Sequence, residues 1–323
     1  MDIQIQHYAP VLIPTLNRYE HLKECLESLE NCTGAEFTEV YVGLDFPPAK
    51  KYEVGWKLCS DYLKEKENNN GFKKLSVIRR EQNCGAITNS NLLINSMKGT
   101  FRTYIFTEDD NIFSPNFLDY MNKGLALYES KPEIMAVCGY SYIEIEKLKT
   151  KSNVIAYRKY SGWGTGHWCD KVFSYKLMGR EVYRESVLKS WKKAIKLLWV
   201  HPISINDFLS MHFRNQTYGD SLANAQLCLE NKYCIFPKIS LVRNCGHDGS
   251  GEHCGESSVF KNQVIDNSIL FSYDDLIYSS YFPNDTYFKS RIMSRIVVPL
   301  VAIVRYCGYR ITGRDLFSFR FKR

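Results

Sequence analysis

The sequence lacks the features that mark several large classes of protein. It has no low-complexity tract, no internal repeat and no linker rich in proline or serine, so a fibrous or disordered chain is excluded and one compact unit is favoured. Residues 1–4 (MDIQ) carry neither a basic leader nor an apolar signal core, so a cytoplasmic protein is expected. The apolar run at residues 296–304 would span about 14 Å as a helix, too short for a bilayer core.

The cysteine count indicates the redox state of the thiols, and the distribution of charge indicates the kind of partner. The eleven cysteines are an odd count in a chain of this size, so reduced thiols are expected. The formal charge of +7 arises from 42 basic and 35 acidic residues. Nine of the basic residues and one acid lie from Lys289 onward, which leaves 33 basic and 34 acidic residues before it. A near-neutral body with a basic tail, and no known nucleic-acid-binding module, argues against nucleic acid as a partner.

The first 140 residues alternate between short β-branched runs and helical patterns. Strands are predicted at residues 10–14, 38–44, 75–79, 103–107 and 134–138, with helices at 18–30, up to about 66, 87–97 and 115–129. This alternation predicts an α/β fold with a mostly parallel sheet covered by helices.

The pattern is less regular after residue 139. Residues 140–160 are interpreted as a hairpin or insertion, and residues 161–168 (SGWGTGHW) as a loop rich in glycine and aromatic residues. One helix is then expected to carry Leu188, Trp191, Ile195 and Leu198 on one face, with lysines opposite.

Three adjacent acids follow the predicted strand at residues 103–107. Glu108, Asp109 and Asp110 would lie at the carboxyl end of that strand, where ligands bind in open α/β sheets. Their mutual repulsion is offset best by a cation, and Mg²⁺ or Mn²⁺ prefers carboxylate and phosphate oxygens. The alternative is a solvated first turn of the next helix, where acids are also favoured.

Three segments together resemble a known family. Residues 11–18 (VLIPTLNR), 83–91 (NCGAITNSN) and 104–117 (YIFTEDDNIFSPNF) occur in the order found in GT-A glycosyltransferases. The chain is similar to glycosyltransferase family 2 and to N-acetylglucosaminyltransferases with a Glu-Asp-Asp version of the DxD motif. The resemblance covers roughly residues 8–140. It implies a GT-A domain at 1–288, with a nucleotide-sugar half at 1–140 and an acceptor half at 141–288, followed by the basic tail at 289–323.

The resemblance also implies roles for individual residues on the donor side. Asp110 would bind Mn²⁺ or Mg²⁺, while Glu108 and Asp109 would orient it or contact ribose. Asp45 would contact the nucleotide, although it could instead form a turn before Pro47. The remaining implied donor contacts are Pro14, Thr15, Asn17, Arg18, Asn83 and Asn91.

On the acceptor side, an inverting transferase needs one general base beside the acceptor hydroxyl. Asp220 fits this role best and Asp207 is second, while a helix N-cap is the alternative for Asp220. Trp163 and Trp168 would either pack on a sugar or belong to the core.

The turn-rich stretch at residues 244–255 allows several interpretations. His253 matches the family's C-terminal metal or phosphate contact, with His247 in reserve. Cys245 and Cys254 together with these histidines could suggest zinc, but no CxxC pair is present. A surface loop without chemistry is the remaining alternative.

The predicted function is that of a metal-dependent, inverting glycosyltransferase. It would move a sugar from a nucleoside-diphosphate donor, expected to be UDP-linked, to a glycan or lipid-linked acceptor in bacterial surface-polysaccharide synthesis. A sugar-phosphate nucleotidyltransferase is the first alternative, and it is disfavoured because no glycine-rich phosphate loop follows the first strand. A non-catalytic glycan-binding protein is the second, and it is disfavoured because three adjacent acids without a bound cation would only repel one another. The tail at 289–323 is expected either to contact the anionic inner face of the membrane or to pack on the domain.

Overall fold

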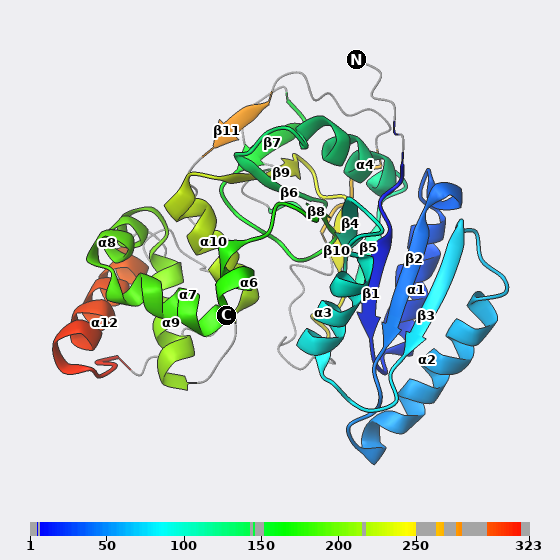
Figure 1. Ribbon diagram of the computed structural model, residues 1–323, viewed down its shortest axis with the longest axis horizontal. Coiled ribbons are helices and arrows are strands. Elements are labelled where there is room, and N and C mark those ends of the chain that lie inside the picture. Colours follow the sequence, from blue (N-terminus) through cyan, green and yellow to red (C-terminus); the bar gives the residue numbers. More distant parts are fainter. Residues whose placement is uncertain are drawn as a thin grey trace.

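The computed structural model describes residues 5, 7–142, 145, 152–214, 218–249, 263–267, 276–279 and 296–317. A large sheet runs through the molecule, and a group of helices lies at the end opposite the first three strands (Figure 1). The strands are β1 (Val11–Thr15), β2 (Glu39–Leu44), β3 (Lys74–Arg79), β4 (Thr103–Phe106), β5 (Asn111–Phe113), β6 (Ile134–Cys138), β7 (Val154–Tyr157), β8 (Thr165–Trp168), β9 (Tyr233–Pro237), β10 (Val242–Asn244) and β11 (Ile277–Ser279).

The helices follow the alternation expected for the first half of the chain and become dense in the second half. They are α1 (Tyr19–Glu30), α2 (Glu53–Lys66), α3 (Ala86–Met97), α4 (Phe117–Tyr128), α6 (Ser174–Met178), α7 (Arg180–Lys189), α8 (Trp191–Val200), α9 (Pro202–Arg214), α10 (Gly219–Glu230) and α12 (Val298–Thr312). The predicted α/β class is confirmed. None of the helices in the described part of the chain is long and apolar enough to cross a membrane.

The first half of the sheet is parallel. Strand β1 pairs in parallel with both β2 and β4, and β2 pairs in parallel with β3. Alternate residues of β1 belong to different cores: Val11 and Ile13 pack with Leu22 of α1, whereas Leu12 packs with Leu93 of α3. Because side chains alternate across a strand, helices cover both faces of the sheet here, as the sequence predicted.

The second half of the sheet is mixed, and it corrects the interpretation of residues 161–168 as a loop. Residues 165–168 form β8, which lies antiparallel between β4 and β6 and is fully buried. The glycines permit close packing here. A Cβ on Gly164, whose φ is +64°, would lie 2.9 Å from Val242, and one on Gly166 would lie 3.1 Å from Leu125. Trp168 is therefore a core residue, 2% exposed.

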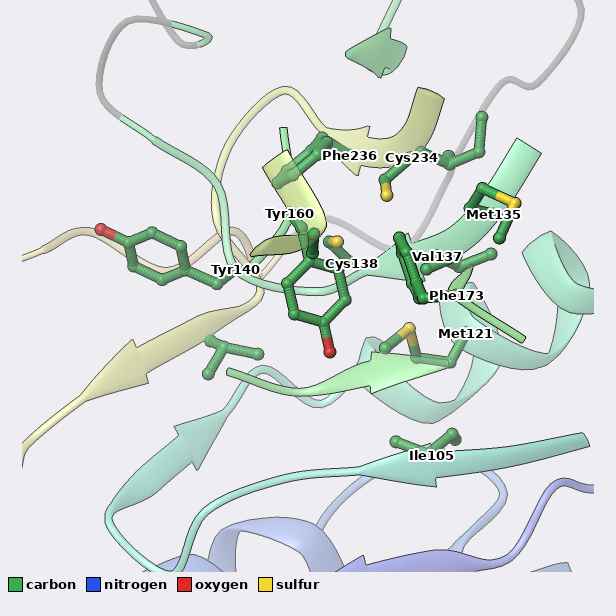
Figure 2. Packing of buried hydrophobic residues seen from close by; sticks show 14 of the residues in the cluster. Ile105, Met121, Met135, Val137, Cys138, Tyr140, Tyr160, Phe173, Cys234 and Phe236 are labelled. Atoms are coloured by element: carbon green, nitrogen blue, oxygen red, sulfur yellow. The ribbon is translucent and has the colours of Figure 1, made fainter. Parts of the chain in front are cut away.

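The core of this half joins segments that are distant in sequence. Figure 2 shows Val137 and Cys138 of β6 packed near Phe236 of β9 and Phe173, which precedes α6. Strand β9 pairs in parallel with β6 and antiparallel with β7, while β11 pairs in parallel with β7. The full order is β11-β7-β9-β6-β8-β4-β1-β2-β3.

Two further expectations for the second half need correction. The single helix expected around residues 188–198 is two helices, because Ser190 ends α7 and caps α8 by accepting a bond from Lys193 N at 3.4 Å. As a result, Trp191 and Ile195 are exposed to solvent.

The apolar run of the tail begins α12, which packs mainly on α9. Arg305, which directly follows the apolar run, is 2% exposed and bonded to Asp315 at 2.8 and 2.9 Å. At least this part of the tail therefore packs on the rest of the protein.

Candidate active site

The acidic triplet lies between two short strands at the carboxyl edge of the parallel sheet. Strand β4 ends at Phe106 and β5 begins at Asn111, so Glu108, Asp109 and Asp110 occupy the turn between them. Strand β1 runs parallel to β4, and its last residue, Thr15, donates from Oγ1 to Asp109 Oδ2 at 2.6 Å. The turn after β1 therefore contacts the acidic triplet directly.

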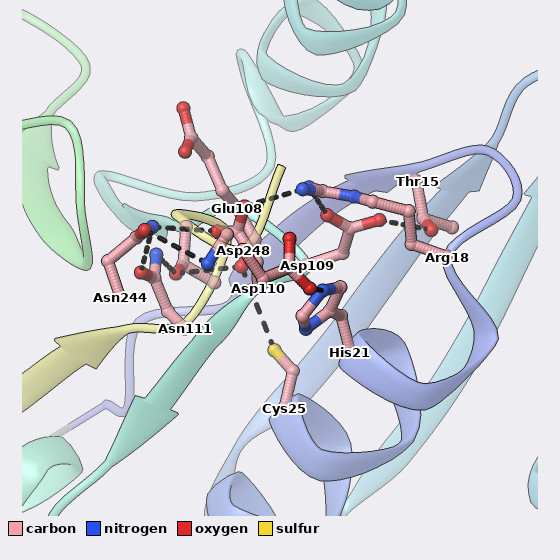
Figure 3. Close-up of polar contacts among 12 residues, drawn as sticks. Thr15, Arg18, His21, Cys25, Glu108, Asp109, Asp110, Asn111, Asn244 and Asp248 are labelled. Atoms are coloured by element: carbon pink, nitrogen blue, oxygen red, sulfur yellow. Dashed lines mark hydrogen bonds and ion pairs between the residues drawn. The ribbon is translucent and has the colours of Figure 1, made fainter. Parts of the chain in front are cut away.

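Arg18 connects the two aspartates. It is the residue before α1, and its guanidinium bonds to Asp109 and to Asp110, the latter at 2.7 Å between Nη1 and Oδ2 (Figure 3). Burial alone would lower the pKa of Arg18, but the charges of Asp109 and Asp110 raise it overall. The guanidinium is thus held charged against two carboxyl groups that are 4% and 6% exposed.

One guanidinium does not balance the negative charge gathered here. Burial raises the pKa of Asp109 despite the opposing effect of Arg18. The pKa of Glu108 is raised to about 8, first by burial and then by the charges of Asp110 and Asp220. Figure 3 shows the Glu108 carboxyl group pointing away from Arg18. The cluster consequently has an excess of carboxyl groups, which a bound cation would stabilise in their charged form.

The C-terminal half contributes a second wall to this cluster. Strand β10 pairs antiparallel with β5, and Asn244 faces Asn111. Asn244 Nδ2 donates to Asp110 Oδ1 at 2.8 Å, and Cys245 N donates to the Asp110 carbonyl at 2.8 Å. A Cβ on Gly246 would overlap the Asp110 carboxylate, lying 2.8 Å from its Cγ. Glycine at this position therefore allows the loop to approach Asp110.

These contacts explain how Asp110 is held, and sequence reasoning missed them. Asn244 and Gly246 come more than 130 residues after Asp110, and no local motif links them to it. The only available signal was the glycine-rich composition of residues 244–255, which indicated a loop but not its partner.

The histidines near this loop have different positions. His247 lies against Trp163, with ring centroids 5.7 Å apart, and Trp163 in turn contacts Tyr140 at 4.7 Å. Trp163 is thus partly buried next to the loop that holds Asp110. His253, the predicted metal or phosphate contact, and Cys254 lie outside the described residues.

The residues present are compatible with a metal that takes few ligands from the protein. Among the residues described by the structure, no group of three or more His, Cys, Asp or Glu side chains is placed to hold an ion. Mg²⁺ and similar ions commonly use one or two carboxylates, with waters and substrate phosphates completing the shell. The excess of carboxyl groups around Asp110 fits such an ion better than a site made only of protein ligands.

Asp45 shapes the predicted donor loop. Its carboxylate is 3% exposed and accepts bonds from Cys84 N at 3.0 Å, Gly85 N at 2.9 Å and Asn83 Nδ2 at 3.2 Å. Both oxygens are therefore engaged in joining the end of β2 to the turn before α3. Asp45 also accepts from Phe46 N at 2.9 Å, so part of its expected turn-forming role is present as well.

The asparagines of this loop differ in burial. Asn83 and Asn91 are exposed, and Asn83 Nδ2 also donates to the Phe46 carbonyl at 2.7 Å. Asn89, which was not singled out from the sequence, is the buried one: its Nδ2 donates to the Gly43 carbonyl at 2.7 Å. Asn89 therefore fixes α3 to β2, while Asn83 and Asn91 remain accessible to a ligand.

The two candidate bases occupy neighbouring helices. Asp220 lies in the first turn of α10 and is exposed, but Tyr218 is the N-cap residue, so the N-cap interpretation of Asp220 is wrong. A Cβ on Gly162 would lie 3.7 Å from Asp220 Oδ1, which places Asp220 beside the segment leading to β8. Asp207 in α9 is 7% exposed and accepts a hydrogen bond from Ser221 Oγ.

The electrostatic effect of Asp220 on Glu108 relates the two predicted halves of the site. The negative charge of Asp220 contributes to the raised pKa of Glu108. Burial is the main cause of the raised pKa values of Tyr160 and Tyr175, and the charge of Asp220 raises both further. For Tyr160, the neighbouring Tyr175 has a larger effect than Asp220. The charge of Asp220 thus acts on a residue of the acidic triplet and on two buried tyrosines.

Comparison with known proteins identifies a family. The family model described as "Glycosyl transferase family 2" matches residues 11–187, more than half of the chain. This range contains the acidic triplet, Arg18 and the loop at residues 83–85, and it ends before Asp220. No curated protein matches the chain.

Several solved structures show low overall similarity to the chain. Residues 1–349 of Staphylococcus aureus TarS in complex with UDP are 17% identical, with a TM-score of 0.30 and coverage of 47% of this chain and 36% of that one. Mannosyltransferase PcManGT from Pyrobaculum calidifontis, in complex with GDP-Man and Mn²⁺, is 11% identical, with a TM-score of 0.39 and coverage of 69% of both chains. GalNAc-T7 with UDP, GalNAc and Mn²⁺ is 12% identical, with a TM-score of 0.43 and coverage of 75% and 44%. The chain spans between 22% and 36% of the length of the TarS chains that it matches.

Proposed function

The chain belongs to glycosyl transferase family 2, and from this premise we propose that it transfers a sugar from a nucleoside-diphosphate donor to an acceptor hydroxyl with inversion. The observation that supports the proposal most strongly is the arrangement of Thr15, Arg18, Asp109 and Asp110 at the carboxyl edge of β1 and β4, where α/β sheets bind ligands. We propose UDP as the nucleotide.

On the donor side, the protein would bind the nucleotide between the ends of β1 and β2. Pro14, Thr15 and Asn17 lie at the first of these ends, and Asp45 holds the loop at the second. The exposed amides of Asn83 and Asn91 would then contact the donor directly. Thr15 and Arg18 would act mainly by fixing Asp109, because both already bond to its carboxylate.

On the metal side, Asp110 would hold Mn²⁺ or Mg²⁺, and His253 is the proposed further ligand. When bound, such an ion would supply positive charge to stabilise the diphosphate leaving group. The bonds from Asn244 and Arg18 orient the Asp110 carboxylate for this role. Glu108 and Asp109 would contribute negative charge around the ion or contact ribose.

On the acceptor side, Asp220 would take the proton from the attacking hydroxyl. It is solvent-exposed at the start of α10 and lies beside Gly162, in the segment that leads into β8. Strand β8 pairs with β4, the strand that precedes the acidic triplet. We propose a glycan or lipid-linked saccharide as acceptor, in bacterial surface-polysaccharide synthesis. We also propose that the enzyme works at the inner face of the membrane, with contact through the tail at 289–323.

The test is a product assay on the full chain with UDP-sugars in Mn²⁺ and in excess chelator. We expect UDP as the released product, strong loss of turnover in chelator, and a loss of roughly 100-fold or more for Asp110→Asn, because the ion would lose its principal protein ligand. Asp61→Asn is the matched control, since Asp61 forms an exposed pair with Lys57 on α2.

Three outcomes would contradict the proposal in different ways. Release of pyrophosphate from a nucleoside triphosphate would indicate a nucleotidyltransferase. Undiminished turnover of Asp110→Asn in Mn²⁺ would show that the metal ligand is wrongly assigned. Glycan binding without turnover of any nucleotide sugar would indicate a non-catalytic protein.

A further inference from the structure

Helix α8 presents an apolar stripe to solvent. Trp191, Ile195 and Trp199 are spaced four residues apart, so they lie along one face of the helix. They are 65%, 44% and 82% exposed, whereas Ala194 and Leu197 on the opposite face are fully buried. Helix α8 thus has two apolar surfaces: one packs onto the protein, and the stripe is a second that faces solvent.

Helix α12 presents a second stripe. Leu300, Ile303, Val304 and Ile311 are between 39% and 82% exposed. At 3.6 residues per turn they fall within an arc of roughly 100°. The opposite face, which includes Ala302, is buried. Both helices are therefore apolar on two faces, of which only one is covered by the described part of the chain.

The two helices adjoin each other at the same end of the molecule. Tyr306 of α12 donates from its hydroxyl to the Leu188 carbonyl at 3.1 Å, and Arg310 Nη1 donates to the Lys189 carbonyl at 2.8 Å. These carbonyls end α7, immediately before α8 begins. Figure 1 shows α8 and α12 together at the end of the molecule opposite β1–β3.

The charged residues of the two helices themselves have one sign. Helices α8 and α12 carry Lys192, Lys193, Lys196, Arg305 and Arg310 and no acidic residue. Arg305 is buried, so the other four supply the charge near the surface. Tryptophan beside lysine and arginine is typical of surfaces that lie in the interface of an anionic membrane.

We infer that α8 and α12 form one docking face for an anionic bilayer surface. The inference rests on the membrane contact proposed above and adds α8, which lies about 100 residues before the tail. The basic charge favours this occupant over a second copy of the chain, because two identical basic faces would repel each other. Docking is superficial: the apolar side chains enter the boundary between headgroups and acyl chains while the lysines contact anionic lipids.

The test is sedimentation of the full chain with vesicles of phosphatidylcholine alone or with 30% phosphatidylglycerol. We expect binding to the anionic vesicles only, weakened by salt. The double variant Trp191→Ser/Trp199→Ser should reduce it at least tenfold, and so should Leu300→Ser/Ile311→Ser. Val54→Ser/Leu58→Ser is the matched control, because these residues form an exposed apolar pair four residues apart on α2.

Each result bears on a stated part of the inference. If only the α12 variant loses binding, the proposed tail contact stands and the role of α8 is overturned. If the wild-type protein does not bind anionic vesicles, the tail contact and the role of α8 are both overturned. If light scattering shows a dimer that Trp191→Ser/Trp199→Ser converts to a monomer without changing vesicle binding, the face is a self-association surface instead. Turnover of the nucleotide sugar with a soluble acceptor is measured in parallel, and all variants should retain it.

Discussion

At the scale of single residues, Asp220 differs from the other acids in its position. Asp109 and Asp110 are buried and bonded to Arg18, whereas Asp220 is exposed in the first turn of α10. A general base must reach the acceptor and exchange its proton with solvent, and of these three aspartates Asp220 is the one with that access. The buried carboxylates of Asp109 and Asp110 are suited instead to hold a positive charge in place.

This difference predicts the effect of Asp220→Asn. Transfer should fall by about 10²- to 10⁴-fold, because an amide cannot accept the acceptor proton. Donor affinity, measured by calorimetry with UDP, should stay within about twofold, since Asp220 lies outside the cluster around Arg18. Loss of UDP binding together with transfer would show that Asp220 supports the structure of the site instead. Asp207→Asn serves as the comparison, because Asp207 is the buried partner of Ser221.

At the scale of elements, the sequence predicted the strands and helices that owe their pattern to local burial. Strands β1, β2, β3, β4 and β6 and helices α1 to α4 lie within a few residues of the expected positions. Each is long enough for periodicity to show, and its flanking turns are close in sequence. The contact between Thr15 and Asp109 was not among these predictions, although both residues lie at the carboxyl ends of adjacent parallel strands.

The elements that were missed depend on partners far along the chain. Strand β5 has three residues and exists through pairing with β10, 130 residues later. Strand β8 has a loop-like composition, and its burial between β4 and β6 decides its conformation. Asn244 reaches Asp110 only through the β5–β10 pairing. Composition within a short window carries no information about such pairings.

The junction between α8 and α9 gives a prediction about pH. Burial lowers the pKa of His201 to about 4, with a further contribution from Lys159, and its Nδ1 lies 2.8 Å from Ser204 Oγ. In the unfolded chain His201 takes up a proton as the pH falls below about 6.5, whereas in the folded protein its imidazole stays neutral down to about pH 4. The free energy of unfolding therefore decreases as the pH drops from about 6.5 to about 4.

Replacing the imidazole should remove this part of the pH dependence. Between pH 7 and pH 5 the free energy of unfolding of His201→Gln should decrease less than that of the wild type, by at most about 2 kcal/mol. Urea unfolding at the two pH values measures the difference. His7→Gln, at an exposed position near the N-terminus, is the control. An unchanged pH dependence in His201→Gln would mean that His201 is protonated equally in both states.

At the scale of the whole molecule, the net positive charge is concentrated in the last 35 residues of the sequence. The formal charge of +7 is accounted for by residues from 289 onward. Arg305 and Arg310, which lie in the described part of the tail, differ in role. Arg305 is buried and bonded to Asp315, whereas Arg310 is at the surface beside the end of α7. Arg305 therefore belongs to the packed interior of the tail, and Arg310 contributes charge at its surface.

Arg305 also connects the tail helix to the helices that carry the candidate bases. Its Nη1 donates to the Asn206 carbonyl at 3.0 Å and its Nη2 to Ser210 Oγ at 3.2 Å. The next residue after Asn206 is Asp207, which accepts from Ser221, the neighbour of Asp220. A continuous chain of contacts therefore links α12 through α9 to the start of α10.

Arg305→Met should consequently lower the free energy of unfolding by about 3–5 kcal/mol, because it leaves Asp315 and the carbonyl of Asn206 without their buried partner. Urea unfolding measures this loss, and Arg102→Met is the control, since Arg102 is 86% exposed in its pair with Glu129 and such pairs contribute about 0–1 kcal/mol. Transfer at a temperature where the variant is folded should also fall, with UDP affinity retained, because the disturbance reaches α10 and not β1. A variant as stable and active as Arg102→Met would show that the tail helix is held by apolar packing on α9 alone.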